Sequence, residues 1–242
     1  MSSATVKISM KNGGIAFSEL DSVDFMGLYL DFYVQSPVEA VPQECFPNLK
    51  KLISFSLAYF PFMPDGWSFA WNVSMPLQKR RLFCCVDGEN RTFVAKTHSW
   101  EPSPYERNPR MTVQMVSDIS GMESVTMVDC AENVPSDRIL GELFSRFFSD
   151  QSQSFLKIYE EDETFGIKNS EICRDDENSE NVEESQEVAF TFRCGCTKEK
   201  IAKIFHRMAK KDLDYLFGRE HTLQIECPRC GFKYGIRKDD IK

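Results

Sequence analysis

Two pairs of cysteines near the C-terminal end constrain this chain more than any other feature. One glycine separates Cys194 from Cys196, and a proline and an arginine separate Cys227 from Cys230. Zinc(II) prefers four soft ligands in a tetrahedron, and thiolate sulfurs at about 2.3 Å provide them. The stretch around the pairs holds few apolar residues, so its fold needs to be stabilised by a bound metal or a cross-link. The spacing therefore predicts one zinc per chain, bound by Cys194, Cys196, Cys227 and Cys230.

Each pair has a local sequence that suits metal binding. Cys227 and Cys230 are expected on a tight turn whose amides point at the sulfurs, with Gly231 supplying the positive φ that such a turn needs. Cys194 and Cys196 are two residues apart, so an extended segment would direct both side chains to one face. Residues 198–217 are expected to form one or two helices that bring the pairs together. Four thiolates would leave no open coordination position for catalysis.

The other five cysteines are dispersed along the sequence. The total of nine is odd and the N-terminus does not look like a secretion signal, which argues against a disulfide framework. Cys84 and Cys85 are neighbours in an expected strand and should point to opposite faces, at least one of them into the core. Cys173 borders an acidic run and is expected to be exposed, which leaves it as a secondary candidate for a redox role. Cys45 and Cys130 have no partner nearby in sequence.

Charge and motifs narrow the class of protein. The net charge is −8, yet residues 188–242 carry 13 Lys or Arg against 7 Asp or Glu. This asymmetry is typical either of a nucleic-acid-binding tail or of two domains that attract each other. No apolar run is long enough for a membrane span, and a cytoplasmic location is expected. The three histidines suggest no Ser/His/Asp arrangement and no phosphate-binding glycine loop is present, so we expect a protein that is not an enzyme.

The residue pattern indicates an α+β protein with two parts. Strands are expected at 6–10, 15–17, 111–117 and 124–129, a hairpin at 81–96, and helices at 46–59 and from about residue 135, with Ser136 as N-cap. Residues 1–160 form the expected mixed α/β domain, in which most of the phenylalanines are core. The run 175–187 has seven acidic residues in thirteen, so 161–188 is expected to be an acidic linker. Residues 189–242 are the expected zinc domain.

The segment from Phe192 to Ile241 resembles the C-terminal zinc domain of heat-shock protein 33 along its whole length. The matching positions are Cys194, Cys196, Thr197 to Lys200, Cys227, Cys230, Tyr234, Ile236 and Asp240. The segments MPLQKRRLFCCVDGENRTFVAKTH and LGELFSRFFSDQSQSFLKI resemble the central hairpin and a helix end of the same family more loosely. The family's helical linker has no counterpart, because the corresponding region is short and acidic. The chain is thus similar to a divergent member of this family.

The resemblance implies a redox-regulated holdase that binds unfolding proteins. Oxidation would form the disulfides Cys194–Cys196 and Cys227–Cys230, release zinc and unfold the small domain. A homodimer on oxidation is also implied. The short linker suggests that activation is modest, so a constitutive chaperone that has lost redox sensing is one alternative. A zinc module for RNA or protein is the other, supported by the basic tail, although the acidic remainder of the chain speaks against nucleic acid.

Overall fold

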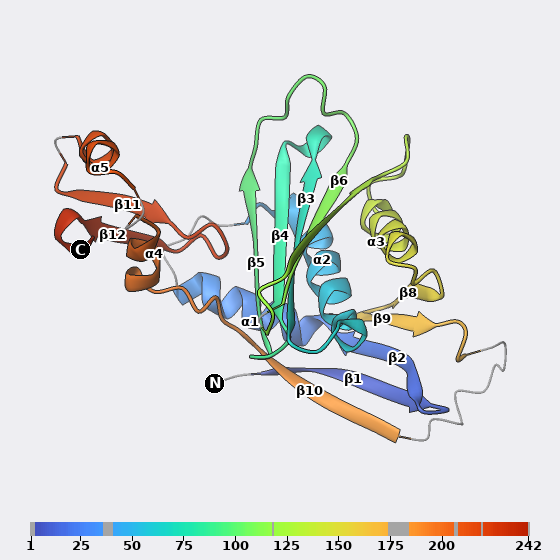
Figure 1. Ribbon diagram of the computed structural model, residues 1–242. Helices are drawn as coiled ribbons and strands as arrows, with labels where there is room; N and C mark the ends of the chain where they lie inside the picture. The colour runs from blue at the N-terminus through green and yellow to red at the C-terminus, as the bar shows by residue number, and fades with distance from the viewer. Residues whose placement is uncertain are drawn as a thin grey trace.

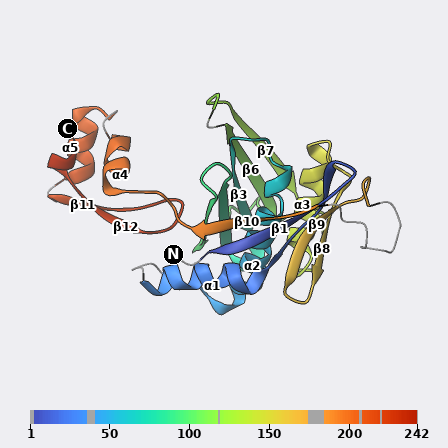
Figure 2. The same cartoon turned by 90° about the horizontal axis from the view of Figure 1, so that it is seen from below.

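The computed structural model describes residues 3–35, 41–117, 119–173, 184–205, 208–218 and 220–241. A long curved sheet surrounds one helix, and a small module of helices and a hairpin is attached beside it (Figures 1 and 2). The strands of the sheet are β1 (Ala4–Lys11), β2 (Gly14–Asp21), β3 (Trp67–Met75), β4 (Arg80–Asp87), β5 (Thr92–Ser99), β6 (Arg110–Ser117), β7 (Glu123–Asp129), β8 (Leu156–Glu161), β9 (Thr164–Asn169) and β10 (Glu184–Phe192). Its helices are α1 (Ser22–Gln35), α2 (Phe46–Ala58) and α3 (Ile139–Asp150).

The sheet has two halves that meet at a short contact. Its strand order is β7-β6-β3-β4-β5-β10-β1-β2-β9-β8. Every neighbouring pair is antiparallel except β5 and β10, which are parallel and pair only at Thr92–Thr191 and Phe93–Phe192. Before that contact β10 pairs with β1, from Ala4–Phe190 to Met10–Glu184. The two halves therefore diverge on one side of the β5–β10 contact.

Helix α2 fills the space that the two half-sheets enclose. It contacts β4 and β5 of one half and β2 and β9 of the other. Leu49, Leu52, Ile53 and Leu57 are fully buried, which agrees with the helical spacing that predicted them. A helix buried on several sides is apolar around most of its circumference, and α2 follows this rule because Phe55 and Ala58 are buried as well.

An aromatic cluster joins α2, β3 and α3. Tyr59 stacks on Phe148 with ring centroids 5.5 Å apart and meets Phe69 edge-on at 5.6 Å. Its hydroxyl donates to Oε1 of Gln153 at 2.6 Å, which satisfies the polar end of this buried ring. Phe144 and Phe147 are also fully buried. The prediction that the phenylalanines of this region are core is confirmed, and these rings are not available to bind a partner.

Several local expectations differ from the structure. Helix α3 begins at Ile139 with Arg138 before it and no side-chain cap, so Ser136 is not the N-cap. Helix α1 and strand β3 were not foreseen. Strand β3 was missed although its apolar residues alternate with Ser, Ala and Asn, the period of a half-buried strand. Its pairing with β4 and β6 confirms the strand. Among the described residues, no helix is long and apolar enough to cross a membrane.

The expected linker at 161–188 is largely wrong where it can be compared. Strand β9 and the first part of β10 fall inside it, and both belong to the ten-stranded sheet. The acidic residues of β10 hid its pattern, since Val188 and Phe190 alternate on the core side while Glu187 and Ala189 face outward and are exposed. Residues 174–183, which include most of the acidic run, lie outside the described residues. The division between a domain ending near residue 160 and one starting at 189 stays a prediction.

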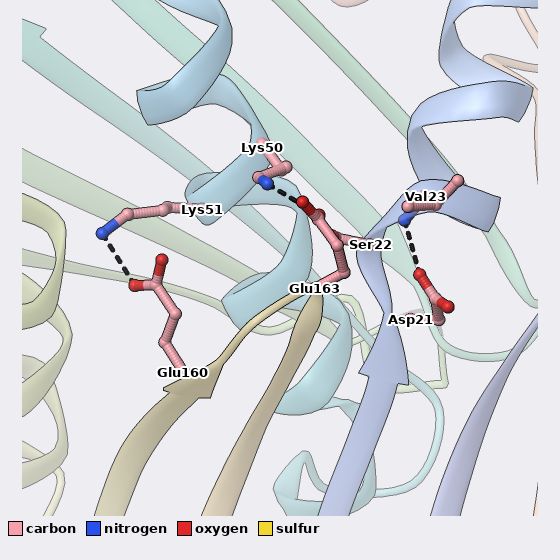
Figure 3. Close-up of polar contacts among 7 residues, drawn as sticks. All are labelled: Asp21, Ser22, Val23, Lys50, Lys51, Glu160 and Glu163. Carbon is pink, nitrogen blue, oxygen red and sulfur yellow. Dashed lines mark hydrogen bonds and ion pairs between the residues drawn. The ribbon is translucent and has the colours of Figure 1, made fainter.

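Polar contacts fix the β8–β9 turn against α2 and the start of α1 (Figure 3). Glu163 accepts a hydrogen bond from Ser22 at 2.8 Å and pairs with Lys50 at 2.8 Å, and Glu160 pairs with Lys51 at 2.7 Å. Lys50 and Ser22 hold the pKa of the Glu163 carboxyl below its usual value. Each surface pair contributes little alone, but together they tie the far edge of the sheet to the central helix.

The C-terminal module has a small core of its own. It contains α4 (Lys198–Phe205), α5 (Lys210–Phe217) and a hairpin of β11 (Thr222–Glu226) and β12 (Lys233–Arg237). The expected helices between the cysteine pairs are thus confirmed. Among the described residues of the module, its buried cluster consists of Ile201, Ala202, Phe205 and Ile236, with a few partly buried side chains packed against it. Such a core is too small to hold a module by hydrophobic burial alone.

The position of β10 in the sheet leads to a test by mutation. Phe190 is fully buried and its ring lies 5.0 Å from that of Phe60. Phe190→Ala should lower the free energy of unfolding by about 3–5 kcal/mol, because it leaves a cavity in the core. Ser185→Ala, on the exposed part of the same strand, should change it by less than about 0.5 kcal/mol. Urea unfolding measures both, and equal small changes would show that β10 is not a core strand.

Candidate metal centre

The turn between β11 and β12 presents Cys227 and Cys230. The amide of Gly231 donates to the carbonyl of Cys227 at 2.9 Å, and the amide of Cys227 donates to the carbonyl of Phe232 at 2.8 Å. Gly231 has a φ of +78°, in the left-handed region that favours glycine. The expected tight turn and the expected role of Gly231 are both confirmed. Both cysteines are buried.

The other pair sits on a turn rather than on an extended segment. Gly195 has a φ of +65°, and residues 193–197 form no strand. The expectation of an extended segment is therefore wrong, and the left-handed glycine is what directs Cys194 and Cys196 toward the same point. Lys200 supports this turn by donating from Nζ to the carbonyl of Gly195 at 2.8 Å. Thr197 accepts the amide of Lys200 at 3.2 Å and so caps α4.

The four sulfurs converge into a single cluster. All lie within 4.8 Å of one another, with Cys194–Cys227 at 3.6 Å and Cys196–Cys230 at 3.5 Å. In a tetrahedral complex with bonds of about 2.3 Å, neighbouring sulfurs are roughly 3.8 Å apart. The four residues therefore fit a tetrahedral metal ion closely, and the donor set of four thiols suits a soft or borderline cation. Among the described residues, this is the cluster of His, Cys, Asp and Glu side chains suited to a metal.

The cluster favours a thiolate at Cys227. Hydrogen bonds from the thiols of Cys194 and Cys230, together with the amides of Arg229 and Cys230, hold the pKa of Cys227 well below its usual value. The same hydrogen bonding raises the pKa of Cys194, which keeps its proton. Tyr234 adds a contact at the edge, with its hydroxyl 3.1 Å from the sulfur of Cys196. A cation bound among the four sulfurs would stabilise all four as thiolates, so that Cys194 would lose its proton as well.

The four-cysteine cluster is docked on the sheet. The face of β4 and β5 that points away from α2 packs against the Cys227–Cys230 turn, and α1 contributes Phe32. Two polar contacts reinforce this packing: Nη2 of Arg229 lies 3.0 Å from the sulfur of Cys85, and Lys96 pairs with Glu226 at 3.4 Å. The buried residues of this interface are Phe83, Cys85, Val94, Cys227 and Cys230. The chain thus buries its candidate metal site between module and sheet.

The sequence foresaw the four cysteines but not their contact surface. Cys84 faces the main core and Cys85 faces the module, which confirms that the two point to opposite faces. The contact between Cys85 and Arg229 depends on the tertiary structure. The sequence feature that could have indicated it is the arginine inside the Cys-Pro-Arg-Cys turn. Cys173 is only half-buried and its sulfur contacts the carbonyl of Ala16 at 3.5 Å. Burial raises the pKa of Cys173, as it does for Cys45 and Cys130, which makes them weaker nucleophiles.

Comparison with known proteins places these features in a family. The model of the Hsp33 protein family matches residues 113–237, slightly more than half of the chain. The 33 kDa chaperonin of Bacillus cytotoxicus is 29% identical over 77 residues, which cover 32% of this chain and 26% of the relative. That of Lactobacillus acidophilus is 34% identical over 59 residues, covering 24% and 19%. The matched region thus spans about a quarter or less of the length of these curated relatives.

A solved structure extends the likeness of fold to the whole chain. The 33 kDa chaperonin of Thermotoga maritima superimposes with a TM-score of 0.65 over 98% of this chain and 96% of that one. The sequence identity is 11%, so this likeness concerns the fold. It confirms the α+β class, with a sheet domain followed by a small four-cysteine module.

The sulfur geometry predicts how the site responds to a spectroscopic metal. Cobalt(II) added to the reduced chain should bind at one ion per chain and give the thiolate charge-transfer absorption of a tetrahedral complex, because four sulfurs already converge. Cys227→Ser should weaken the absorption and the affinity. Cys130→Ser, a buried cysteine outside the cluster, should leave both unchanged. Absence of charge-transfer absorption in the reduced wild-type chain would contradict the site.

Proposed function

The chain belongs to the Hsp33 family, and on that premise we propose that it is a redox-regulated chaperone that binds unfolding proteins. The oxidation sensor is a zinc site made by Cys194, Cys196, Cys227 and Cys230. The observation that carries the proposal is the convergence of these four sulfurs at a surface where the module covers an apolar part of the sheet. The proposed location is the cytoplasm, whose reducing conditions keep such thiols ready for oxidation.

The sensor works through the stability of the module. Zinc at this site would supply folding free energy on the order of 10–16 kcal/mol, as it does in other structural sites. The module's own buried cluster is small, so its fold depends on the cysteines remaining thiolate ligands. Loss of those ligands removes the staple, and the remaining core is not sufficient to hold the module folded.

A peroxide oxidises each cysteine pair in two steps. One thiolate attacks a peroxide oxygen, the O–O bond breaks, and a sulfenic acid forms while the peroxide is reduced to water. The neighbouring thiol attacks the sulfenic sulfur, a disulfide forms, and a second water leaves. The family resemblance assigns the pairs Cys194–Cys196 and Cys227–Cys230. The sulfurs of Cys194–Cys227 and Cys196–Cys230 are also close, so peptide mapping of the oxidised chain is the way to identify the pairs.

Undocking of the module supplies the apolar surface for unfolding proteins. Phe83 and Val94 are buried at the interface, and they become exposed when the Cys227–Cys230 turn leaves the sheet. Exposed apolar patches of this kind bind other non-polar surfaces by the hydrophobic effect. A second copy of the chain could cover the same face, which is the basis for proposing a dimer after oxidation. No step requires bond chemistry on a substrate, so the proposal is a binding protein rather than an enzyme.

Nucleic-acid binding receives less support from the module. Two of the cations that favoured it pair with acids of the same module: Lys238 lies 2.5 Å from Asp214, and Arg237 lies 3.9 Å from Asp240. A third cation, Arg229, faces Cys85 at the interface with the sheet. These pairings reduce the charge available to phosphates. A constitutive chaperone is favoured by a groove between the two half-sheets, whose lining includes no residue of the module.

The redox proposal is tested by comparing three forms of the chain. Reduced metal-bound, peroxide-oxidised and metal-stripped protein are each added to a thermally unfolding client enzyme, and light scattering records aggregation. The oxidised and metal-stripped forms should suppress aggregation more than the reduced form, because both lack the staple of the module. Equal suppression by all three would indicate constitutive activity, and no suppression by any would contradict the chaperone proposal.

The docking contact is tested by Arg229→Ala. This change removes the contact with Cys85 and should weaken docking by about 1–3 kcal/mol. The reduced, metal-bound variant should therefore suppress aggregation better than reduced wild type. Arg237→Ala is the matched control, since it removes an exposed arginine of the same module that pairs with Asp240. Wild-type behaviour of Arg229→Ala with its metal retained would show that this contact does not restrain the module.

A further inference from the structure

A groove with apolar walls and a polar rim opens where the two half-sheets diverge. Its cavity volume is about 490 Å³. One wall is formed by core-side residues of β1 and β10, including Ile8, Met10 and Val188. The other is formed by Phe60 and Met63, which follow α2, and by Trp67 at the start of β3. Gly88 lies between the walls, where a Cβ would come within 3.0 Å of the carbonyl of Trp67. Several of these side chains are half-buried, so apolar surface remains open to a ligand.

The open backbone edge of β10 determines what kind of ligand fits. The amides of Thr191 and Arg193 donate to carbonyls of Arg91 and Phe93 at 3.2 and 3.0 Å. Because backbone groups alternate along a strand, those of Ser185, Glu187 and Ala189 point to this same side. The part of β10 before the β5 contact pairs with β1 alone in the described residues. An unpaired edge of this kind is a template for an added strand.

The rim of the groove gives the ligand a charge preference. Asp65 and Glu89 are exposed on one side, and Arg91 is the single cation among the lining residues. Neither acid forms an ion pair with another described residue. Excess negative charge next to apolar walls favours a segment that has apolar side chains in its centre and Lys or Arg at its ends. Such segments are common where the core strands of a protein become exposed.

We propose that this groove binds an extended, apolar segment of a non-native polypeptide as an additional strand on the open edge of β10. The backbone of the segment pairs with the N–H and C=O groups of Ser185, Glu187 and Ala189 that point away from β1. Its alternate side chains enter the groove between Met10 and Trp67. This inference rests on the proposed chaperone function and names the class of ligand and the surface that it uses.

The groove is separate from the surface under the module. None of its lining residues comes from α4, α5, β11 or β12, and β10 lies along the lower margin of the ribbon while the module stands beside the upper part of the sheet (Figure 1). Binding here therefore does not require release of the module. The groove gives the reduced protein a basal capacity for unfolded chains, to which oxidation adds the second surface.

A pair of peptides tests the proposal on the full, metal-bound chain. The probe is a short peptide in which valine alternates with threonine between two terminal lysines, labelled with a fluorophore for anisotropy. Its control is the same peptide with alternate amides N-methylated, which keeps the side chains but cannot add to a strand edge. The control should bind about tenfold more weakly, the effect of losing one or two hydrogen bonds. Equal binding of the two peptides would overturn strand addition.

Variants of the chain locate the edge and the rim. Glu187→Pro removes one outward amide, which edge strands tolerate, and should weaken binding about tenfold, whereas Glu187→Ala keeps the amide and should bind as wild type. Should Glu187→Pro fail to fold by circular dichroism, the exposed pair Asp65→Lys with Glu89→Lys still tests the site. That variant should weaken the lysine-ended peptide and strengthen a glutamate-ended one. No change with either peptide would overturn the assigned groove.

Redox state separates this inference from the proposed function. The lysine-ended peptide should already bind the reduced, metal-bound chain, and more tightly than its N-methylated control, since no residue of the module lines the groove. Peptide binding that appears only after oxidation would overturn the groove. Suppression of aggregation without peptide binding would overturn the groove and leave the chaperone proposal standing. Peptide binding without suppression of aggregation in any state would overturn the chaperone proposal and leave the groove standing.

Discussion

Strand β10 holds the three parts of this protein together. It pairs with β1 from Phe190 to Glu184, meets β5 at Thr191 and Phe192, and leads directly to Cys194. Its core side buries Phe190 against Phe60, while Phe192 lies against Phe32 and Phe93. Because one strand makes all these contacts, the angle between the half-sheets, the open groove and the position of the first cysteine pair are set together.

The four-cysteine cluster and the sheet stabilise each other through a shared surface. The buried cluster that contains Cys227 and Cys230 is completed by Phe83, Cys85 and Val94 of the sheet. Covering these residues keeps apolar area from water, at about 25 cal/mol for each Å². The module can pack in this position only if the two cysteine turns keep their conformation. Its own buried cluster is too small to hold those turns in place. A change of thiol chemistry at four sulfurs can therefore alter the exposure of a surface on another part of the chain.

The fold has two surfaces with apolar residues, one open in the groove between the half-sheets and one covered by the module. The aromatic residues that the sequence made conspicuous, such as Phe147 and Phe148, fill the space around α2 and α3 and are fully buried. The surfaces suited to binding are made by less conspicuous residues, with Met10 and Trp67 in the groove and Phe83 and Val94 under the module. One surface depends on the module and the other does not, so the proposed redox-dependent binding and the proposed basal binding use different parts of the chain.

The sequence by itself determined the site and most of the local elements. Four cysteines at that spacing, with Gly231 after the second pair, specify a turn that converges sulfurs, and the alternation in residues 111–117 specifies a strand, because both depend on near neighbours. Only the tertiary structure decided the role of 184–192, where acidic residues obscure the apolar Val188 and Phe190 until β1 pairs beside them. The same holds for Arg229 and Cys85, which are far apart in sequence and 3.0 Å apart in space. Contacts of that kind arise from packing between distant segments, and no local pattern encodes them.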